Sequence, residues 1–312
     1  MMNICRFTPD KTADWDHFVN RSRQGTFLFL RGYMDYHSDR FCDHSLMVYR
    51  HNRLFALLPA NADGTTLWSH QGLTYGGLLT GEEATVADVC QTFADINAYL
   101  RRQGFCRVVY KAVPWIYHRL PADEDLYALT HICHAALTTR HIASALPAHQ
   151  RLRFSESRRS GLRKALREGL TVHETEDLAA FWHILDANLH RKYGAHPVHS
   201  LAELQLLKAR FPQHIRLFMT YRQAEPLGGT LIYETPQVVH TQYISASPEG
   251  KACGALDVLF DEVINRVYAD APYFDFGKSS NADGSELNEP LIFQKEGFGG
   301  RGVCYDWYTY TL

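Results

Sequence analysis

The chain has 312 residues, of which 46% are hydrophobic and 21% are charged, and its formal net charge is −2. This composition is typical of a soluble globular protein, and the length suits two domains of ordinary size that each bury a core. The near-neutral charge argues against a protein that coats nucleic acid over its whole surface, and it leaves room only for a local basic patch.

The cysteines and the first residues indicate the compartment. Seven cysteines are spread along the chain without close pairs, which is the pattern of reduced thiols used as small core residues. The opening stretch MMNICRFTPDKTADW has neither the basic nor the apolar region of a secretory signal, and no apolar run is long enough to span a bilayer. We therefore predict a cytoplasmic protein with no membrane insertion.

The first half of the chain predicts an alternation of short helices and strands. Residues 15–22 predict a helix with Trp15, Phe18 and Val19 on one side. The polar pair His51 and Asn52 lies between two apolar runs, which predicts a hairpin. The other predicted elements are, in order, a strand over 65–77 that ends in a Gly-rich bend, an amphipathic helix over 81–104, a strand over 106–114, a helix over 122–133 and a strand over 135–144.

Two polar stretches of this half are candidates for binding. Residues 25–45 are so rich in charged and hydrogen-bonding side chains that we do not expect them in a core, so they predict a solvated loop or the wall of a binding cleft. Residues 69–77 (SHQGLTYGG) would suit an acceptor pocket between the two domains, or else form a Gly-rich strand end with ordinary turn residues. From the two stretches together we predict that an acceptor binds to Arg31, Tyr33, Asp35, His37 and Tyr75.

The segment 151–169 (RLRFSESRRSGLRKALREG) is the most basic part of the chain. Seven arginines and lysines outnumber Glu156 and Glu168 there. One interpretation is a solvated helix face at a domain boundary. The other is a phosphate-binding surface formed by Arg158, Arg159, Arg163 and Lys164, because guanidinium groups bind phosphate oxygens in pairs.

The second half predicts a three-stranded antiparallel meander followed by a loop, a helix and a strand. Short apolar runs at 215–221, 227–234 and 238–246 are separated by turn residues. The loop 247–254 leads into a helix over 256–267, and a strand follows over 273–277. One face of that helix is predicted to be buried by Leu256, Leu259, Phe260, Val263, Ile264 and Val267. Backbone N–H groups at the start of such a helix can hold a phosphate or an oxyanion.

The two halves repeat the same order of elements. Trp15 and Trp182 are 167 residues apart, and so are the strand starts at Cys106 and Tyr273. The first meander strands, at Ser45 and Ile215, are 170 apart. We therefore predict a tandem duplication of one α/β unit, with an N-terminal domain over 1–150 on the acceptor side and a C-terminal domain over 151–312 on the donor side.

The second half also carries a family likeness. The stretches SRRSGLRKALREGL, FWHILDANLHRKYGAHPVHSL, IRLFMTYRQAEPLGGTLIYE, GALDVLF and FDFGKSSNADGSELNEPLIFQKEGFGG resemble the Fem-type family of tandem-GNAT transferases. The resemblance implies an α/β fold of two GNAT-like domains and transfer of an acyl or aminoacyl group onto an amine. The implied acceptor is a peptidoglycan precursor, another cell-envelope amine or a small molecule. The family's closing motif places a lysine that holds substrate and developing charge, and this lysine corresponds to Lys295.

The acyl donor stays open between acyl-CoA and aminoacyl-tRNA. The chain has no long helical-hairpin insertion of the kind that some family members use to bind tRNA. The coenzyme A signature Q/R-x-x-G-x-G/A is matched only in part, by Ser247, Gly250 and Ala252. The cofactor-binding candidates of this loop are Gly250, Lys251 and Gly254.

Acyl transfer needs a deprotonated amine and a group that stabilises the oxyanion. Lys295 and then Lys278 are the candidate donors, and Asp275 and Tyr243 are the candidate bases on the flanking strands. The histidine pairs in HICH and HPVH lack the further ligands of a closed metal site, so we predict no metal, and no G-x-S-x-G motif supports a serine hydrolase. Three functions remain: a Fem-like acyl or aminoacyl transferase, an acyl-CoA N-acyltransferase acting on a small amine, and a GNAT-like protein that binds a ligand without turnover.

Overall fold

The computed structural model describes residues 2–312, and contacts divide the chain into two compact units. Unit 1 consists of Met1–His141, Ser280–Glu286 and Cys304–Leu312, and unit 2 consists of Ile142–Ser279 and Leu287–Val303. The assignment of an acceptor domain to 1–150 and a donor domain to 151–312 stays a prediction, because the units are defined by contacts and not by what each one binds.

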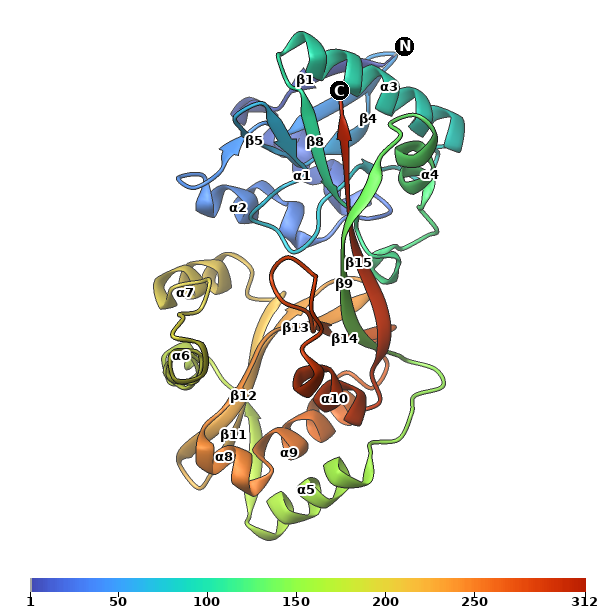
Figure 1. The fold of residues 1–312 in the computed structure, drawn as a ribbon. Helices are drawn as coiled ribbons and strands as arrows, with labels where there is room; N and C mark the ends of the chain where they lie inside the picture. Colours follow the sequence, from blue (N-terminus) through green and yellow to red (C-terminus); the bar gives the residue numbers. More distant parts are fainter. Residues whose placement is uncertain (1) are drawn as a thin grey trace. The chain divides into compact units, whose positions relative to one another are not determined.

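Unit 1 contains two groups of strands with helices packed on them (Figure 1). The first sheet has the order β1-β3-β4-β7, from β1 (Asn3–Arg6), β3 (Leu46–Arg50), β4 (Arg53–Leu58) and β7 (Leu79–Thr80). The second group runs β9-β15-β8-β6-β5-β2, from the unit 1 parts of β9 (Ala136–Pro147) and β15 (Arg301–Thr311), β8 (Arg107–Lys111), β6 (Thr66–Trp68), β5 (Asn61–Asp63) and β2 (Cys42–Asp43). The helices are α1 (Thr12–Arg21), α2 (Arg31–Met34), α3 (Val86–Arg102) and α4 (Glu124–His131).

Most of the elements predicted for the first half are confirmed. His51 and Asn52 both have positive φ angles, of 47° and 60°, as a two-residue hairpin turn between β3 and β4 requires. Helix α3 begins with a capping box between Thr85 and Asp88. The strand predicted over 65–77 is wrong beyond Trp68, where β6 ends. Strand β6 pairs with β5 and β8.

The prediction that residues 25–45 stay out of the core is wrong in part, because Asp35, Asp39 and Arg40 are exposed but other polar residues of the stretch are buried. Arg31, Tyr33 and His37 are only 4%, 3% and 2% exposed. Arg31 is tolerated there because its guanidinium pairs with Asp43 at 3.0 Å and with Asp35, and lies 4.0 Å from the centre of the Phe7 ring. A polar stretch of sequence was therefore not an exposed one. Arg31 can be buried because Asp43, which lies in β2 further along the chain, pairs with it.

Unit 2 is one sheet with helices on both faces. Its strand order is β10-β11-β12-β13-β14-β9, from β10 (Leu170–Glu174), β11 (Ile215–Arg222), β12 (Glu225–Glu234), β13 (Val238–Ala246), β14 (Tyr273–Lys278) and the unit 2 part of β9. Its helices are α5 (Glu156–Arg167), α6 (Leu178–Tyr193), α7 (Leu201–Arg210), α8 (Pro248–Cys253), α9 (Ala255–Glu262) and α10 (Glu289–Gly297).

The predicted meander is confirmed, since β11, β12 and β13 pair antiparallel in sequence order. Helices α6 and α7 lie on one face of these strands and α9 lies on the other (Figure 1). On the α9 side, Leu259, Phe260 and Ile264 are fully buried against the sheet. On the α6 side, a Cβ at Gly229 of β12 would overlap the Met219 sulfur of β11 and lie 3.1 Å from the ring of Phe181 of α6, so the glycine makes room for both elements.

Two details of the second half differ from prediction. The segment 247–254 is not a loop, because Pro248–Cys253 form helix α8, capped by the Ser247 side chain. The helix after it is α9 followed by a π-helical turn over Val263–Val267, and Val267 is 38% exposed instead of buried. The π-helical turn shifts the helical phase, so a face drawn at regular α-helical spacing no longer predicts burial at its end.

Candidate functional site

The candidate site lies where two parallel strands of unit 2 separate. β13 and β14 pair at Val238, Val239 and His240 opposite Tyr273, Phe274 and Asp275, and in the described chain this ladder ends there. Both strands are irregular just beyond this point. The register of β13 shifts against β12 between Leu231 and Ile232, and that of β14 shifts against β9 between Asp275 and Lys278. These bulges redirect the carboxyl ends of the two strands, so a ligand can enter between them.

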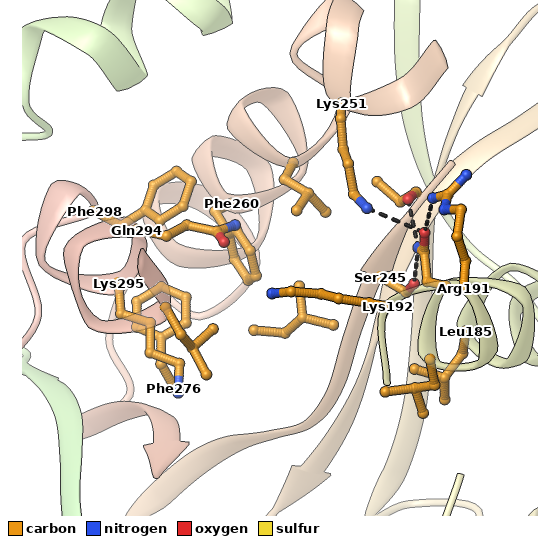
Figure 2. Close-up of a pocket in the computed structure, with 16 residues that line it drawn as sticks. Leu185, Arg191, Lys192, Ser245, Lys251, Phe260, Phe276, Gln294, Lys295 and Phe298 are labelled. Atoms are coloured by element: carbon orange, nitrogen blue, oxygen red, sulfur yellow. Dashed lines mark hydrogen bonds between the residues drawn. The ribbon is translucent and has the colours of Figure 1, made fainter. Parts of the chain in front are cut away.

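A cavity of about 530 Å³ lies in this opening, a size that suits a small ligand (Figure 2). Strand β13 contributes Ile244, Ser245 and Ala246, and β14 contributes Phe276. The remaining lining residues come from the helices: Leu185, Asn188, Leu189, Arg191 and Lys192 from α6, Lys251 from α8, Leu256 and Phe260 from α9, and Leu291, Gln294 and Lys295 from α10, with Phe298 just after it.

Asn188 connects the polar groups of the lining through its side-chain hydrogen bonds. Its side-chain amide donates to Ser245 Oγ at 2.7 Å and to the Ala246 carbonyl at 2.6 Å, and its Oδ1 accepts from Arg191 at 2.6 Å and from Lys251 at 3.1 Å. Burial, and then the charges of Arg191 and Lys192, lower the pKa of Lys251. Arg191 and Lys251 therefore meet at one end of the cavity through Asn188, and Lys192 is a third cation of the lining.

Lys295 lines the cavity from α10 and is 4% exposed. Its Nζ donates to the carbonyl oxygens of Gly277 and Lys278, at 2.8 and 2.7 Å. Burial lowers its pKa to about 8, although the nearby Asp275 acts in the opposite direction. The resemblance thus selected a lysine that is buried and lies at the cavity. Its role in catalysis stays a prediction.

Asp275 and Lys278 lie at the end of β14, and the cavity lining does not include them. Asp275 is fully buried, and its two carboxylate oxygens are taken, one by His240 Nδ1 at 2.8 Å and the other by the Gly277 N–H at 2.8 Å. This arrangement fixes the bend of β14 at Gly277. Burial lowers the pKa of Lys278.

Tyr243, the other candidate base, is hydrogen-bonded to His199. Its hydroxyl lies 2.7 Å from Nδ1 of His199, and burial raises its pKa to about 12. A phenol with that pKa stays protonated at neutral pH, so this environment does not favour a base.

Sequence reasoning missed Asn188, Lys192 and Gln294. The spacing of Leu185, Asn188, Leu189 and Lys192, which places them on one face of α6, was the available signal for two of them.

The glycines predicted to bind a cofactor have a packing role. A Cβ at Gly250 would overlap the Leu227 carbonyl of β12, and a Cβ at Gly254, whose φ is +83°, would overlap the Gly161 carbonyl of α5. Lys251, the third candidate of this segment, lines the cavity.

The starts of α8 and α9 are the place where a diphosphate of coenzyme A would be expected. In α8, Pro248 has no N–H group, Glu249 is acidic and the Gly250 N–H already bonds to Ser247 Oγ at 3.0 Å. In α9, Asp257 occupies the first turn. These residues do not fit a diphosphate, because the first turn of each helix carries an acidic side chain and α8 has no N–H group at Pro248.

The basic residues of α5 pair with neighbours in unit 2. Arg159 and Arg163 both bind Glu156, at 2.7 and 2.6 Å, and Arg158 binds Asp257 at 3.0 Å. Lys164 donates to the Ala252 carbonyl at 2.7 Å. Arg158 also borders a second cavity of about 320 Å³ that shares Lys251, Leu256 and Gln294 with the first. The phosphate-binding role of the four residues stays a prediction.

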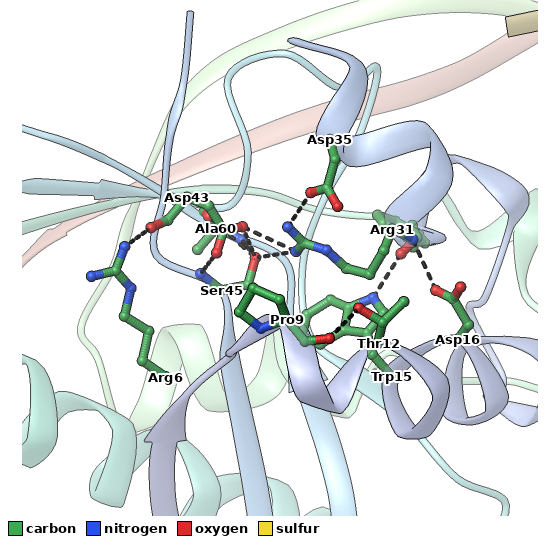
Figure 3. A network of polar contacts seen from close by, with 11 residues as sticks. Arg6, Pro9, Thr12, Trp15, Asp16, Arg31, Asp35, Asp43, Ser45 and Ala60 are labelled. Atoms are coloured by element: carbon green, nitrogen blue, oxygen red, sulfur yellow. Dashed lines mark hydrogen bonds and ion pairs between the residues drawn. The ribbon is translucent and has the colours of Figure 1, made fainter. Parts of the chain in front are cut away.

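The predicted acceptor residues lie in unit 1, and Figure 3 shows Arg31 between Asp35 and the Asp43–Ser45 pair. Tyr33 packs edge-on against Phe27, and His37 stacks on His70 with ring centres 5.2 Å apart. Burial lowers the pKa of His37. Tyr75 is buried, and its hydroxyl donates to Thr26 Oγ1 at 3.2 Å. Acceptor binding by these five residues stays a prediction.

Within residues 2–312, no group of three or more His, Cys, Asp or Glu side chains is arranged to bind a metal ion. The helices in that range are all too short or too polar to cross a bilayer.

Comparisons with known proteins identify the architecture. Residues 153–284 match the model of the acetyltransferase (GNAT) domain. A search of curated proteins gave no match. The crystal structure of FemX superposes with a TM-score of 0.68 at 13% identity, over 99% of this chain and 97% of that one. L-PGS from Bacillus licheniformis superposes with a TM-score of 0.60 at 13% identity, over 97% of this chain and 91% of that one. A tandem GNAT protein from the clavulanic acid biosynthesis pathway superposes with a TM-score of 0.57 at 13% identity, over 100% of this chain and 98% of that one. The chain therefore has the Fem-like tandem GNAT fold.

Proposed function

We propose that the protein is an acyltransferase that moves an acyl or aminoacyl group from an ester or thioester carrier onto an amine, in the cavity of unit 2. The observation that carries the proposal is the separation of β13 from β14 beyond His240 and Asp275, with the buried Lys295 at the resulting cavity. The GNAT match over residues 153–284 covers both strands and supports this reaction class.

In this reaction the neutral amine attacks the acyl carbonyl carbon, a C–N bond forms and the carbonyl electrons move to oxygen. The tetrahedral intermediate collapses when the C–O or C–S bond to the carrier breaks. The proton that the amine loses ends on the departing oxygen or sulfur, so the carrier leaves as its alcohol or thiol. The Lys295 ammonium has three N–H donors, of which two bond to the Gly277 and Lys278 carbonyls. The third is available to the oxyanion, and the two fixed bonds orient it before the substrate arrives.

The cations around the cavity act on the acceptor as well. Arg191, Lys192 and Lys251 disfavour a further positive charge among them. Burial is the main cause of the lowered pKa of Lys251, and the charges of Arg191 and Lys192 lower it further. The same repulsion lowers the pKa of an acceptor ammonium and so increases the neutral fraction that can attack. This effect offers a substitute for a dedicated base, since Asp275 and Tyr243 are engaged elsewhere.

The donor and the acceptor are proposed only as classes. The misfit of a diphosphate at α8 and α9 disfavours acyl-CoA held in the ordinary GNAT manner, and aminoacyl-tRNA remains the other donor. The acceptor is a small-molecule or peptide amine, with a peptidoglycan precursor as one candidate. A second function, binding of an anionic ligand without turnover, is favoured by the same cluster of cations.

The test is a matrix of donors and amines with a mass-spectrometric search for the N-acyl product. Acyl-CoA thioesters of increasing chain length and charged tRNAs serve as donors, and amino acids, polyamines and a cell-wall peptide serve as acceptors. The proposal expects product from at least one pair with the wild type and a loss of that product with Lys295→Met. Binding of an anionic donor without product from any pair would leave the binding protein as the better account.

A further inference from the structure

The cavity of unit 2 combines two chemistries at opposite ends. At one end the cations Arg191 and Lys251 share the Oδ1 atom of Asn188, and Lys192 extends its amine toward the interior (Figure 2). None of the described residues that line the cavity is an aspartate or a glutamate. Like charges held together without a lining carboxylate favour the binding of an anion there.

The opposite wall is formed by three phenylalanines, and Gln294 and Lys295 of α10 lie beside them (Figure 2). The ring centre of Phe260 lies 4.9 Å from that of Phe276 and 5.0 Å from that of Phe298. Phe260 and Phe298 are fully buried, and all three belong to the core cluster between α9 and the sheet. The wall is therefore rigid, and the apolar lining is extended by Leu185, Leu189, Ile244, Leu256 and Leu291. Because the three rings are themselves buried, the apolar surface that meets water in the cavity belongs mainly to the half-buried Leu189, Ile244, Leu256 and Leu291. Water in contact with these side chains is readily displaced by an apolar chain.

We propose that this cavity binds an amphiphile, with an apolar acyl chain against the phenylalanine wall and a single anionic group held by Arg191, Lys192 and Lys251. This inference rests on the proposed function, and it names the acyl class as an uncharged chain longer than acetyl. It disfavours an aminoacyl group, because an α-ammonium would join four lining cations with no carboxylate to receive it.

The anionic group is single because of the neighbouring helices. A diphosphate would extend toward the starts of α8 and α9, where Glu249 and Asp257 lie. A carboxylate or a phosphate monoester at the Asn188 end contacts only cations and the amide. The ligand chemistry is thus that of a fatty acid, an acyl phosphate or an acyl-phosphopantetheine, and these sources are separated by experiment.

The first test measures direct binding to the wild-type chain by calorimetry, below the concentration at which micelles form. The probes are hexanoate, decanoate, decyl phosphate and decylamine. We expect decanoate to bind at least about tenfold more tightly than hexanoate, because the longer chain covers more of the wall. We expect decylamine, with the same chain and the opposite charge, to bind at least about tenfold more weakly than decanoate. Equal affinity within either pair would overturn the proposal.

The second test removes the charges and keeps the stems. The double variant Lys192→Met with Lys251→Met should weaken decanoate binding about tenfold or more and reduce the preference over decylamine. Lys11→Met, at an exposed lysine of unit 1, is the matched control and should bind as the wild type does. Because these positions are exposed, the variants are expected to fold, which thermal unfolding checks. An unchanged preference for decanoate in the double variant would overturn the assignment of the anion site.

These outcomes are distinct from those of the proposed function. If decanoate binds as expected and no donor gives product, the cavity assignment stands and the acyltransferase fails. If acetyl or aminoacyl donors give product and decanoate neither binds nor competes, the acyltransferase stands and the inference fails. A comparison of decanoate, decanoyl phosphate and S-decanoyl-4′-phosphopantetheine as competitors then identifies which source of the chain binds best.

Discussion

The ammonium group of Lys295 donates a hydrogen bond of 2.7 Å to the main-chain carbonyl of Lys278, so a lysine from α10 holds the end of β14 at the place where that strand leaves β13. The same ammonium binds the Gly277 carbonyl, and the Gly277 N–H in turn binds Asp275. The bend of the strand and the position of the cation are therefore set by one connected network. A substitution that alters the bend of β14 is therefore expected to move the Lys295 ammonium, and a substitution of Lys295 is expected to alter the bend.

Lys295→Met should abolish most of the turnover while the chain still folds. The substitution keeps the aliphatic stem and removes the charge, and loss of one oxyanion donor typically costs about 100- to 1,000-fold in turnover. Two buried carbonyls lose their donor, and the burial of a charge is relieved at the same time, so the net change in stability should be modest. Steady-state kinetics measures the effect, with Lys11→Met as the control. Wild-type turnover in Lys295→Met would exclude a catalytic role.

The activity should fall as the pH rises through about 8. The active form of Lys295 is the protonated one, and burial lowers its pKa to about 8, so at pH 9 only about one tenth of the molecules keep the charge. The acceptor amine titrates in the opposite direction and gives the rising limb. A pH profile of kcat/KM measures both. Arginine stays charged throughout this range, so the pH profile of the residual activity of Lys295→Arg should lack the falling limb. A falling limb that persists in Lys295→Arg would belong to another titrating group.

The stability should change with pH through the same group. The pKa of Lys295 is lowered on folding, so the unfolded chain binds more protons between about pH 8 and the ordinary lysine value of 10.5. The free energy of unfolding contributed by this residue therefore rises with pH across that window. Urea denaturation at pH 7 and pH 9.5 should show a larger gain for the wild type than for Lys295→Met. Equal gains would mean that the ammonium is solvated.

Gly277→Ala should destabilise the protein more than Gly169→Ala does. Both glycines have nearly the same positive φ, 69° and 70°, so both pay the cost of a left-handed alanine of about 1 kcal/mol. A Cβ at Gly277 would in addition lie 2.9 Å from the His240 ring, whereas a Cβ at Gly169 meets nothing within 4 Å. The difference between the two variants in urea denaturation isolates the contact with His240. Equal losses would show that this ring moves freely.

Arg31→Met should lower stability and not acceptor affinity alone. Removing one partner of a buried ion pair typically costs about 3–5 kcal/mol, because the remaining charge stays buried. Asp35 is exposed and Asp43 is partly so, which places the loss toward the lower end of that range. Thermal unfolding and the KM for the acceptor distinguish the two roles. A raised KM with an unchanged melting temperature would support the acceptor pocket predicted from the sequence.

The parts of the fold that depend on local pattern could be predicted from the sequence. The meander of β11 to β13, the capped helix α3 and the hairpin at His51 and Asn52 all follow from periodicity, caps and turn residues. The family likeness also selected Lys295, which lies at the cavity.

The parts that depend on distant partners could not. Arg31 is buried because Asp43 reaches it from a later strand. Asn188 connects the polar groups at one end of the cavity because the sheet brings β13 against α6, and no local pattern encodes that pairing. The opening itself depends on two bulges, which are irregularities of pairing between strands and leave no periodic trace.

Strand β15 has a consequence for the synthesis of the protein. Its residues from Trp307 to Thr311 pair with β8, at the centre of a sheet in unit 1, and unit 1 also includes Ser280–Glu286. A ribosome makes the chain from the N-terminus, so β8 cannot pair with β15 until every residue of unit 2 has been translated. Throughout that interval the nascent chain carries an unpaired strand edge, which is a template for aggregation. A translation product that stops before residue 304 would keep that edge permanently open.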